Sequence, residues 1–354
     1  MIELIPRIPL FKLFRSFGVP GMLPVSLTVS VTGRCNSRCM TCNIYNKKTG
    51  ELSLEEYEKI FSSIGKAPYW ITFSGGEPFL REDIAEICKS AYKNCGPKII
   101  NIPTNGLLSD RIEKGVRAIL DGCPGSSLII NLSIDGIGER HDEIRGVKGC
   151  FERAMSTYER LKSIKHKNLT VGIHTVISRY NAKEIPSLYK RIKELKPDSY
   201  ITEIAEERVE LGTIGAGITP SLRDYSAAVD FLSNEMKDWD MKGLARITRA
   251  FRMRYYQTVK KILKDNKEVI PCFAAFASCQ ITPEGDVWAC CIKAENMGAL
   301  RDAGYDFRKT WFSDKAKEVR NSIRQGKCFC PLANASYTNM LFTPQYLFFG
   351  RNSR

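Results

Sequence analysis

Short β-branched runs alternate with longer segments of helical period between residues 25 and 205. This alternation is typical of repeated β/α units whose strands form a parallel sheet. Six strands are predicted, at residues 26–31, 70–73, 98–102, 128–134, 170–177 and 199–204. Because eight units close a full β/α barrel, six predict an α/β fold with an open, partial (β/α)6 barrel of parallel strands. Functional side chains are then expected at the carboxyl ends of these strands.

The helices between the strands have recognisable starts. Ser53 and Glu56 form a capping-box pattern ahead of an apolar helical face. After Glu206 the alternation stops, and residues 222–239 and 244–263 predict two helices that act as a connector. Four parts are therefore expected: an N-terminal extension (1–24), the partial barrel (25–205), a helical connector (206–265) and a small cysteine-rich C-terminal domain (266–354).

The composition is that of a globular protein with a large core, since 43% of its 354 residues are hydrophobic. No run of eighteen apolar residues occurs, and the start lacks the pattern of a secretory signal, so we expect a cytoplasmic protein. The net charge of +14 favours an anionic partner. A phosphate-bearing substrate, a nucleic acid and an acidic membrane surface all satisfy that expectation.

Thirteen cysteines in such a chain predict metal binding rather than disulfides, because cytosolic thiols are kept reduced. Three of them fall within residues 35–42 and six within residues 272–330. The second group surrounds a β-hairpin predicted at residues 279–290, with its turn at residues 283–286.

Cys35, Cys39 and Cys42 follow the first predicted strand and therefore lie on a loop at the functional end of the barrel. Thiolates are soft ligands that suit iron-sulfur clusters or zinc, but a structural zinc site needs four ligands. Three thiolates on a four-iron cluster leave one iron open. The alternatives are a zinc site completed by a distant ligand and three unrelated thiols.

Polar groups also follow the next three strands. The second strand ends in Ser74-Gly75-Gly76-Glu77-Pro78, where glycines allow close backbone approach and oxygen acceptors suit an ammonium group. Asn105 ends the third strand, and Ser133 and Asp135 end the fourth. Arg145 follows, with a planar guanidinium suited to a carboxylate. Asn105 and Asp135 precede glycine, so turn formation is the alternative role for both.

With this three-cysteine loop and the Gly-Gly-Glu-Pro segment, the chain resembles the radical S-adenosylmethionine (SAM) superfamily. The resemblance implies a 4Fe-4S cluster held by Cys35, Cys39 and Cys42, with SAM on the open iron. Thr41 departs from the family pattern, which has a bulky residue there, and Ile44 and Tyr45 are the candidates to replace it. The implied cofactor-binding residues are Gly75, Gly76, Glu77, Pro78, Asn105, Ser133, Asp135 and Arg145.

The distal cysteines resemble the SPASM and twitch extensions of that superfamily, which carry auxiliary clusters. The resemblance implies one auxiliary 4Fe-4S cluster, because four ligands suffice for it. Cys279 and Cys291 leave the ligand set open, and zinc is the alternative metal. The implied ligands are Cys272, Cys290, Cys328 and Cys330.

The implied activity is reductive cleavage of SAM to a 5'-deoxyadenosyl radical, which removes hydrogen from an unactivated substrate carbon. The auxiliary cluster would then transfer an electron or bind the substrate. An external one-electron donor such as flavodoxin or ferredoxin is the implied partner. A peptide is one substrate class, and a small alcohol, sugar, nucleotide or lipid-linked molecule is the other. The non-enzyme alternatives are an iron-sulfur redox sensor or electron carrier and a zinc-bound nucleic-acid-binding module. The Gly-Gly-Glu-Pro segment argues against both, and no nucleic-acid motif is found.

Both ends of the chain combine apolar and basic side chains, in residues 1–23 and 340–354. They either pack onto the barrel or contact an anionic membrane surface. Pro6, Pro9 and Pro20 interrupt a surface helix and favour packing.

Three histidines and one isolated cysteine complete the predictions. His174 is expected to be a satisfied core residue, with a place facing the barrel interior as the alternative. His141 and His166 are expected to face solvent, and Cys88 to pack in the core.

Overall fold

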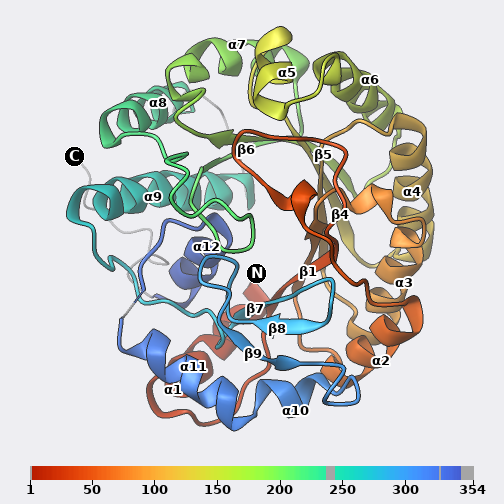
Figure 1. The fold of residues 1–354 in the computed structure, drawn as a ribbon, viewed down its shortest axis with the longest axis vertical. Coiled ribbons are helices and arrows are strands. Elements are labelled where there is room, and N and C mark those ends of the chain that lie inside the picture. Colours follow the sequence, from red (N-terminus) through yellow and green to blue (C-terminus); the bar gives the residue numbers. More distant parts are fainter. Residues whose placement is uncertain (1, 237–243, 327, 344–354) are drawn as a thin grey trace.

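The computed structural model describes residues 2–236, 244–326 and 328–343, and in these it has an α/β architecture (Figure 1). One nine-stranded sheet has the order β6-β5-β4-β3-β2-β1-β7-β8-β9. Its first six strands are parallel to one another. All six predicted strands are confirmed, with ends that shift by at most two residues. Their bounds are β1 Ser26–Thr32, β2 Trp70–Gly75, β3 Ile99–Thr104, β4 Ser127–Ser133, β5 Leu169–Ile177 and β6 Ser199–Ile204.

Helices surround the outside of these strands in a ring (Figure 1). The predicted capping box is confirmed at the first of them, where Ser53 Oγ accepts from Glu56 N and Glu56 Oε2 accepts from Ser53 N. The buried side chains of this helix, such as Ile60 and Phe61, recur at helical spacing and cover the sheet. The bounds are α2 Leu54–Ile64, α3 Ile84–Cys95, α4 Ser109–Gly122, α5 Glu139–Arg145, α6 Cys150–Ser163, α7 Ile185–Leu195 and α8 Leu222–Glu235. Short 3-10 turns lie at η1 Ile2–Arg7, η2 Ile44–Asn46, η3 Pro78–Leu80 and η4 Ala182–Glu184.

The predicted hairpin is confirmed and continues the barrel sheet. Strand β7 (Ser278–Ile281) pairs in parallel with β1, and β8 (Asp286–Trp288) returns antiparallel to β7. Strand β9 (Asn296–Ala299) then pairs with β8. The edge of β1 would otherwise present unpaired backbone groups, and β7 satisfies them. The second cysteine group is thereby brought beside the barrel.

The side that the six strands leave open is occupied by α9 (Leu244–Asp265) and α12 (Ala333–Phe342) (Figure 1). Tyr256 on α9 is hydrogen-bonded to Thr202 on β6, with 2.5 Å between the hydroxyl oxygens. Tyr255 donates to the Pro331 carbonyl at 3.0 Å, and its ring lies 5.4 Å from that of Tyr337. Helix α9 therefore joins β6 to the C-terminal helix, in addition to connecting the two parts of the chain.

Helix α1 (Ile8–Phe17) packs against the C-terminal elements, which confirms the packing alternative for the N-terminal extension. The Phe11 ring lies 4.7 Å from that of Phe342, and the Phe14 ring 5.5 Å from that of Phe276. The other C-terminal helices are α10 (Phe307–Trp311) and α11 (Asp314–Arg324). Of the apolar C-terminal stretch, residues 344–354 lie outside the described residues.

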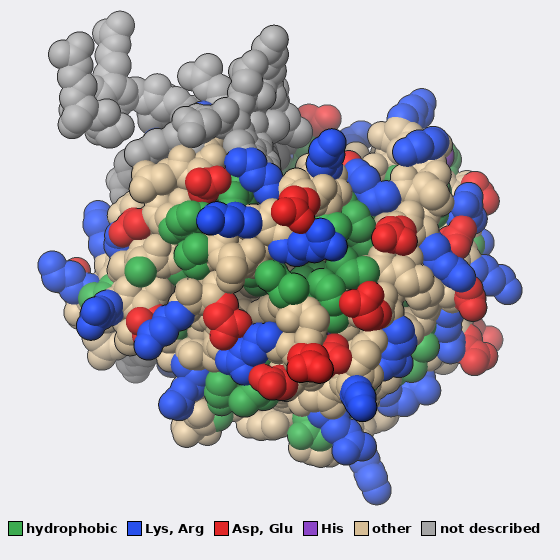
Figure 2. Space-filling model, turned by 90° about the horizontal axis from the view of Figure 1, so that it is seen from above, with side chains coloured by type: hydrophobic (Ala, Val, Ile, Leu, Met, Phe, Trp, Pro, Cys, Tyr) green, Lys and Arg blue, Asp and Glu red, His purple; other side chains and the backbone are tan. Residues whose placement is uncertain are grey.

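No helix in the described part of the chain is both long and apolar enough to cross a membrane. Figure 2 shows one face of the molecule, on which Lys and Arg side chains are interspersed with Asp and Glu. The excess of positive charge is thus spread over this face rather than gathered in one patch.

Candidate functional site

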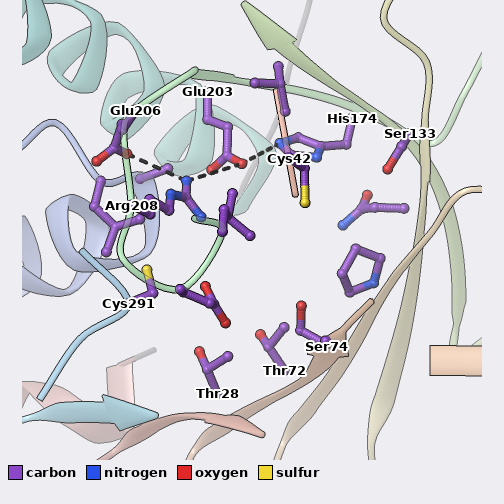
Figure 3. Close-up of a pocket in the computed structure, with 18 of the residues that line it drawn as sticks. Thr28, Cys42, Thr72, Ser74, Ser133, His174, Glu203, Glu206, Arg208 and Cys291 are labelled. Carbon is purple, nitrogen blue, oxygen red and sulfur yellow. Dashed lines mark ion pairs between the residues drawn. The ribbon is translucent and has the colours of Figure 1, made fainter. Parts of the chain in front are cut away.

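A cavity of about 370 Å³ lies inside the arc of strands and reaches their carboxyl ends (Figure 3). This volume falls in the range of small-molecule sites. Cys35, Cys39 and Cys42 line it on one part of its wall, and Cys290 and Cys291 line another. The two cysteine groups, far apart in sequence, therefore contribute to one cavity.

The loop that carries the first three cysteines is held against the last turn of α5. The backbone N–H groups of Arg38 and Met40 donate to the carbonyls of Arg145 and Ile144, each at 2.9 Å. A helix end leaves its last carbonyls without intrahelical partners, and the cysteine loop supplies those partners. The position of the loop therefore depends on a helix about 100 residues further along the chain.

Each of the three thiols has a hydrogen-bond donor directed at its sulfur. Ser37 N lies 3.4 Å from Cys35 Sγ, Ile44 N lies 3.5 Å from Cys42 Sγ, and Arg145 Nη1 lies 3.7 Å from Cys39 Sγ. Burial raises the pKa of Cys35 to about 11 and that of Cys42 to about 12. The N–H donors of Ser37 and Ile44 act in the opposite direction on these two pKa values, because they favour the thiolate, which is the metal-binding form.

The chemistry of this donor set fits an iron-sulfur cluster. Cys35, Cys39 and Cys42 all line the cavity, and iron-sulfur clusters are held by cysteine thiolates. A structural zinc site is closed by four ligands, whereas the loop supplies three.

The two glycines at the end of β2 are required by their contact with the cysteine loop. A Cβ on Gly75 would lie 2.2 Å from the Thr32 carbonyl oxygen, and one on Gly76 would lie 2.1 Å from that of Arg34. Gly75 also has a φ of +131°. Gly76 N and Glu77 N in turn donate to these two carbonyls. The glycines therefore let β2 support the cysteine loop at backbone distance.

Glu77 is buried and its carboxylate is bound by the protein itself. It accepts from Thr104 Oγ1 and Asn105 N at 2.8 Å each, and from Phe79 N at 3.2 Å. Burial raises its pKa to about 7, although these hydrogen bonds favour the ionised form. Pro78 follows, buried at the start of η3. The carboxylate ties the ends of β2 and β3 together, and the role of this segment in SAM binding stays a prediction.

The remaining predicted residues converge on the same wall. Asn105 Nδ2 donates to Asn36 Oδ1 at 2.7 Å, and thereby holds the cysteine loop. Asp135 Oδ2 pairs with Arg145 Nη2 at 2.8 Å, and Ser133 lines the cavity between β3 and β5. Seven of the eight predicted cofactor-binding residues thus line the cavity, and Pro78 is buried next to Glu77 without lining it. Of the two candidates to replace the bulky residue at Thr41, only Ile44 is among the cavity-lining residues.

The expectation that His141 faces solvent is wrong. It is 1% exposed, and its Nδ1 accepts from Asp135 N at 3.1 Å. Burial and the nearby Arg145 lower its pKa to about 4. His166 is exposed and Cys88 is buried, as expected.

His174 takes the alternative position, facing the barrel interior. It lines the cavity, and its Nε2 lies 3.5 Å from Glu203 Oε1 (Figure 3). The sequence favours a core histidine only because that is the commoner place for a histidine within a strand, and the strand alone does not reveal which face meets the cavity.

The distal cysteines form a second group whose charges interact. The pKa of Cys272 is raised to about 12 by burial and by Cys290 and Cys328. Burial also raises the pKa of Cys330, and the charges of Glu206, Cys272 and Cys290 add to that rise. These four are the predicted auxiliary ligands, and that assignment stays a prediction.

Two further cysteines lie apart from this mutual group. Cys279 is buried on β7, where Arg320 is the charged neighbour of its thiol. Cys291 interacts with Arg208 more strongly than with Cys290. Their surroundings favour them less as ligands than the other four.

Three charged residues at the end of β6, Glu203, Glu206 and Arg208, are not among the site residues predicted from the sequence. Arg208 Nη2 lies 3.8 Å from Glu203 Oε1 and 3.6 Å from Glu206 Oε1 (Figure 3). Burial raises the pKa of Glu206 to about 8, with Arg208 opposing the rise. The rule that parallel strands present functional groups at their carboxyl ends, applied to β6, would have found all three.

Two sequence profiles match the chain. The profile of the Radical SAM superfamily matches residues 29–192, from β1 into α7, and that of the SPASM iron-sulfur cluster-binding domain matches residues 272–331. The chain belongs to the radical SAM superfamily. Its radical SAM domain includes the three-cysteine loop and implies a 4Fe-4S cluster with SAM. Its SPASM domain includes the four predicted auxiliary ligands and implies an auxiliary cluster.

Curated relatives of this radical SAM chain include Fe-coproporphyrin III synthase of Methanosarcina barkeri, 32% identical over 47% of the chain and 40% of that protein. AdoMet-dependent heme synthase of Oleidesulfovibrio alaskensis is 25% identical over 78% of the chain and 71% of that protein. The chain spans less than half the length of the first curated relatives it matches.

Solved structures confirm the predicted partial-barrel fold. Streptococcus suis SuiB bound to S-adenosylmethionine has a TM-score of 0.62 at 16% identity, covering 87% of this chain and 70% of SuiB. Native anSMEcpe with bound AdoMet and Cp18Cys peptide has a TM-score of 0.60 at 18% identity, covering 92% and 98%.

Proposed function

We propose that this chain is a radical SAM enzyme that removes hydrogen from an unactivated carbon of a peptide substrate. The observation that carries the proposal is the shared cavity, which is lined by Cys35, Cys39 and Cys42 and also by Cys290 of the SPASM domain. A substrate bound there would lie within reach of both cysteine groups.

When bound, a 4Fe-4S cluster with SAM supplies the electron and the 5'-deoxyadenosyl radical that this reaction requires. The residues of the chain bind and orient these groups. Cys35, Cys39 and Cys42 hold the cluster, and Arg145 Nη1 donates to the sulfur of Cys39. Asp135 fixes the guanidinium of Arg145 through their ion pair. The residues at the ends of β2, β3 and β4 hold SAM, and an external flavodoxin or ferredoxin delivers the electron.

A peptide substrate is supported by fold relatives. Structures similar to this chain include SuiB bound to precursor peptide SuiA and anSMEcpe with bound Cp18Cys peptide. The second candidate is a tetrapyrrole, which the names of the curated heme and coproporphyrin synthases favour. Glu203, Glu206 and Glu210 line the cavity at the end of β6. They disfavour a tetrapyrrole with carboxylate side chains, because such a molecule is an anion.

The activity is tested by anaerobic reconstitution with iron and sulfide, followed by incubation with SAM and a strong reductant. We expect about eight irons per chain and release of 5'-deoxyadenosine. The Cys39→Ala variant should retain only about four irons per chain and release no 5'-deoxyadenosine. Cys95→Ala, which removes a buried thiol on α3 away from the cavity, is the matched control and should keep both properties. Wild-type protein that binds cluster and SAM yet releases no 5'-deoxyadenosine would disprove the proposal.

A further inference from the structure

The cavity wall at the end of β6 carries more acidic than basic side chains, although the whole chain has a net charge of +14. Glu203, Glu206 and Glu210 line this part of the cavity, and Arg208 is the cation among them. Arg208 lies between Glu203 and Glu206, so its charge is already shared by two carboxylates. Glu210 is satisfied separately, since its Oε1 accepts from Ser30 Oγ and from the amide of Gln280.

Glu206 is the member of this wall that lacks a hydrogen-bond partner. It is 5% exposed, and neither carboxylate oxygen has a hydrogen-bond donor. Its separation of 3.6 Å from Arg208 is an ion pair that is too long for a hydrogen bond. Buried polar groups without partners are rare in native proteins, and ionising a buried carboxyl group without one is costly, which is why burial raises the pKa of Glu206 to about 8. A ligand that donates hydrogen bonds to Glu206 would remove that cost.

Arg208 supplies a complementary feature, because its buried Nε has no hydrogen-bond acceptor. The wall therefore presents an unpaired acceptor at Glu206 next to an unpaired donor at Arg208. A ligand that satisfies both carries a cationic donor close to a neutral acceptor such as a carbonyl oxygen. A basic amino-acid side chain on a peptide backbone has this combination.

The position of this wall separates it from the predicted SAM site. In Figure 3, Glu206 and Arg208 lie on the same side as Cys291, whereas Ser133 lies on the other side of Cys42. The residues predicted to hold SAM come from the ends of β2, β3 and β4 and, for Arg145, from the end of α5, whereas Glu206 and Arg208 come from the segment after β6. The carboxylates would repel a phosphate or carboxylate group at this position.

From these observations we infer that Glu206, assisted by Glu203, binds an ammonium or guanidinium group of the substrate. The inference rests on the proposed function and names the substrate class of the same site: a peptide with a Lys or Arg side chain, rather than a nucleotide or a polycarboxylate. Arg208 orients the substrate through an acceptor next to that cation.

The test measures peptide binding and requires no turnover. Reconstituted full-length protein with SAM is dialysed anaerobically against blocked pentapeptides Gly-Gly-X-Gly-Gly, in which X is Lys, Arg, norleucine or Glu. The Lys or Arg peptide should bind at least about tenfold more tightly than the norleucine peptide, as one charge-assisted hydrogen bond predicts. Glu206→Gln should reduce that preference to within about twofold. Glu203→Gln should reduce it partly, and serves as the second variant if Glu206→Gln does not fold.

Glu82→Gln is the matched control, because it makes the same chemical change on a side chain that is 92% exposed and should keep the full preference. The inference would be overturned if wild-type protein bound the four peptides equally, or if the Glu206→Gln variant kept the preference for the Lys or Arg peptide. It would also be overturned if Glu206→Gln lost SAM affinity or auxiliary iron by a similar factor, since Glu206 would then belong to a cofactor site. Failure of the proposed function is seen separately, as absence of 5'-deoxyadenosine with peptide preference intact.

Discussion

At the scale of single residues, a short chain of contacts sets the charge beside the cysteine loop. His141 accepts the backbone N–H of Asp135, Asp135 pairs with Arg145, and Arg145 reaches Cys39. The buried His141 must stay neutral for this arrangement, because its Nδ1 acts as an acceptor. His141, which the sequence predicts to face solvent, therefore supports the predicted metal site through Asp135 and Arg145.

The neutral state of His141 predicts a pH dependence of stability. Its folded pKa of about 4 lies below the ordinary value of 6.5, so its stabilising contribution is complete above pH 6.5 and is lost as the pH falls toward 4. At pH 5 the loss is about 2 kcal/mol of unfolding free energy. His141→Asn keeps an acceptor and removes this titration. Urea unfolding at pH 7 and pH 5 should show a smaller loss for the variant, and equal losses would contradict the assignment.

At the scale of elements, the cysteine loop is held between the end of β2 and the end of α5. A Cβ on Gly146, which follows α5, would lie 2.3 Å from the Arg38 carbonyl oxygen. Gly76 makes the corresponding close approach from β2. Both sides thus need glycine, because a side chain on either would push the loop away from the cavity.

Gly76→Ala should therefore displace the cysteine loop while leaving the SPASM domain in place. We expect the iron content to fall from about eight to about four per chain, with loss of SAM cleavage. Gly50→Ala is the matched control, since a Cβ there meets nothing within 4 Å. Iron and sulfide analysis of both variants checks this result. Full iron loading of Gly76→Ala would show that the loop tolerates the displacement.

At the scale of the whole molecule, helix α1 and the C-terminal elements up to residue 343 form one packed unit. Arg320 on α11 lies at its centre, where it donates to the carbonyls of Ala275 and Trp311 at 2.7 Å each. Its guanidinium lies 4.6 Å from the Trp311 ring centre and 5.0 Å from that of Phe14. Burial lowers its pKa to about 10, which still leaves it charged near neutral pH. Helix α1 is therefore part of the core.

Removing one aromatic contact between the ends tests this arrangement. Phe11 is fully buried, and Phe11→Ala should lower the unfolding free energy by about 3–5 kcal/mol through loss of packing against Phe342. Leu10→Ala, on the 39% exposed neighbour, should change it by less than about 0.5 kcal/mol. Chemical denaturation gives both values. A mild effect of Phe11→Ala, together with loss of binding to anionic vesicles, would instead favour the membrane role of the N-terminal extension.

The sequence by itself determined the strands, the capping box at Ser53 and the positions of both cysteine groups, because these depend on local periodicity and spacing. Only the tertiary structure decided that β7 joins β1, that His141 is buried and that Glu206 meets Arg208 in the cavity wall. The first depends on a distant segment that supplies a partner strand, whereas the other two depend on how the short loops after β4 and β6 fold back on themselves, and the periodicity of the sequence carries neither kind of information. The composition makes the chain basic, with a net charge of +14. Only folding brings Glu203, Glu206 and Glu210 together in the cavity wall at the end of β6.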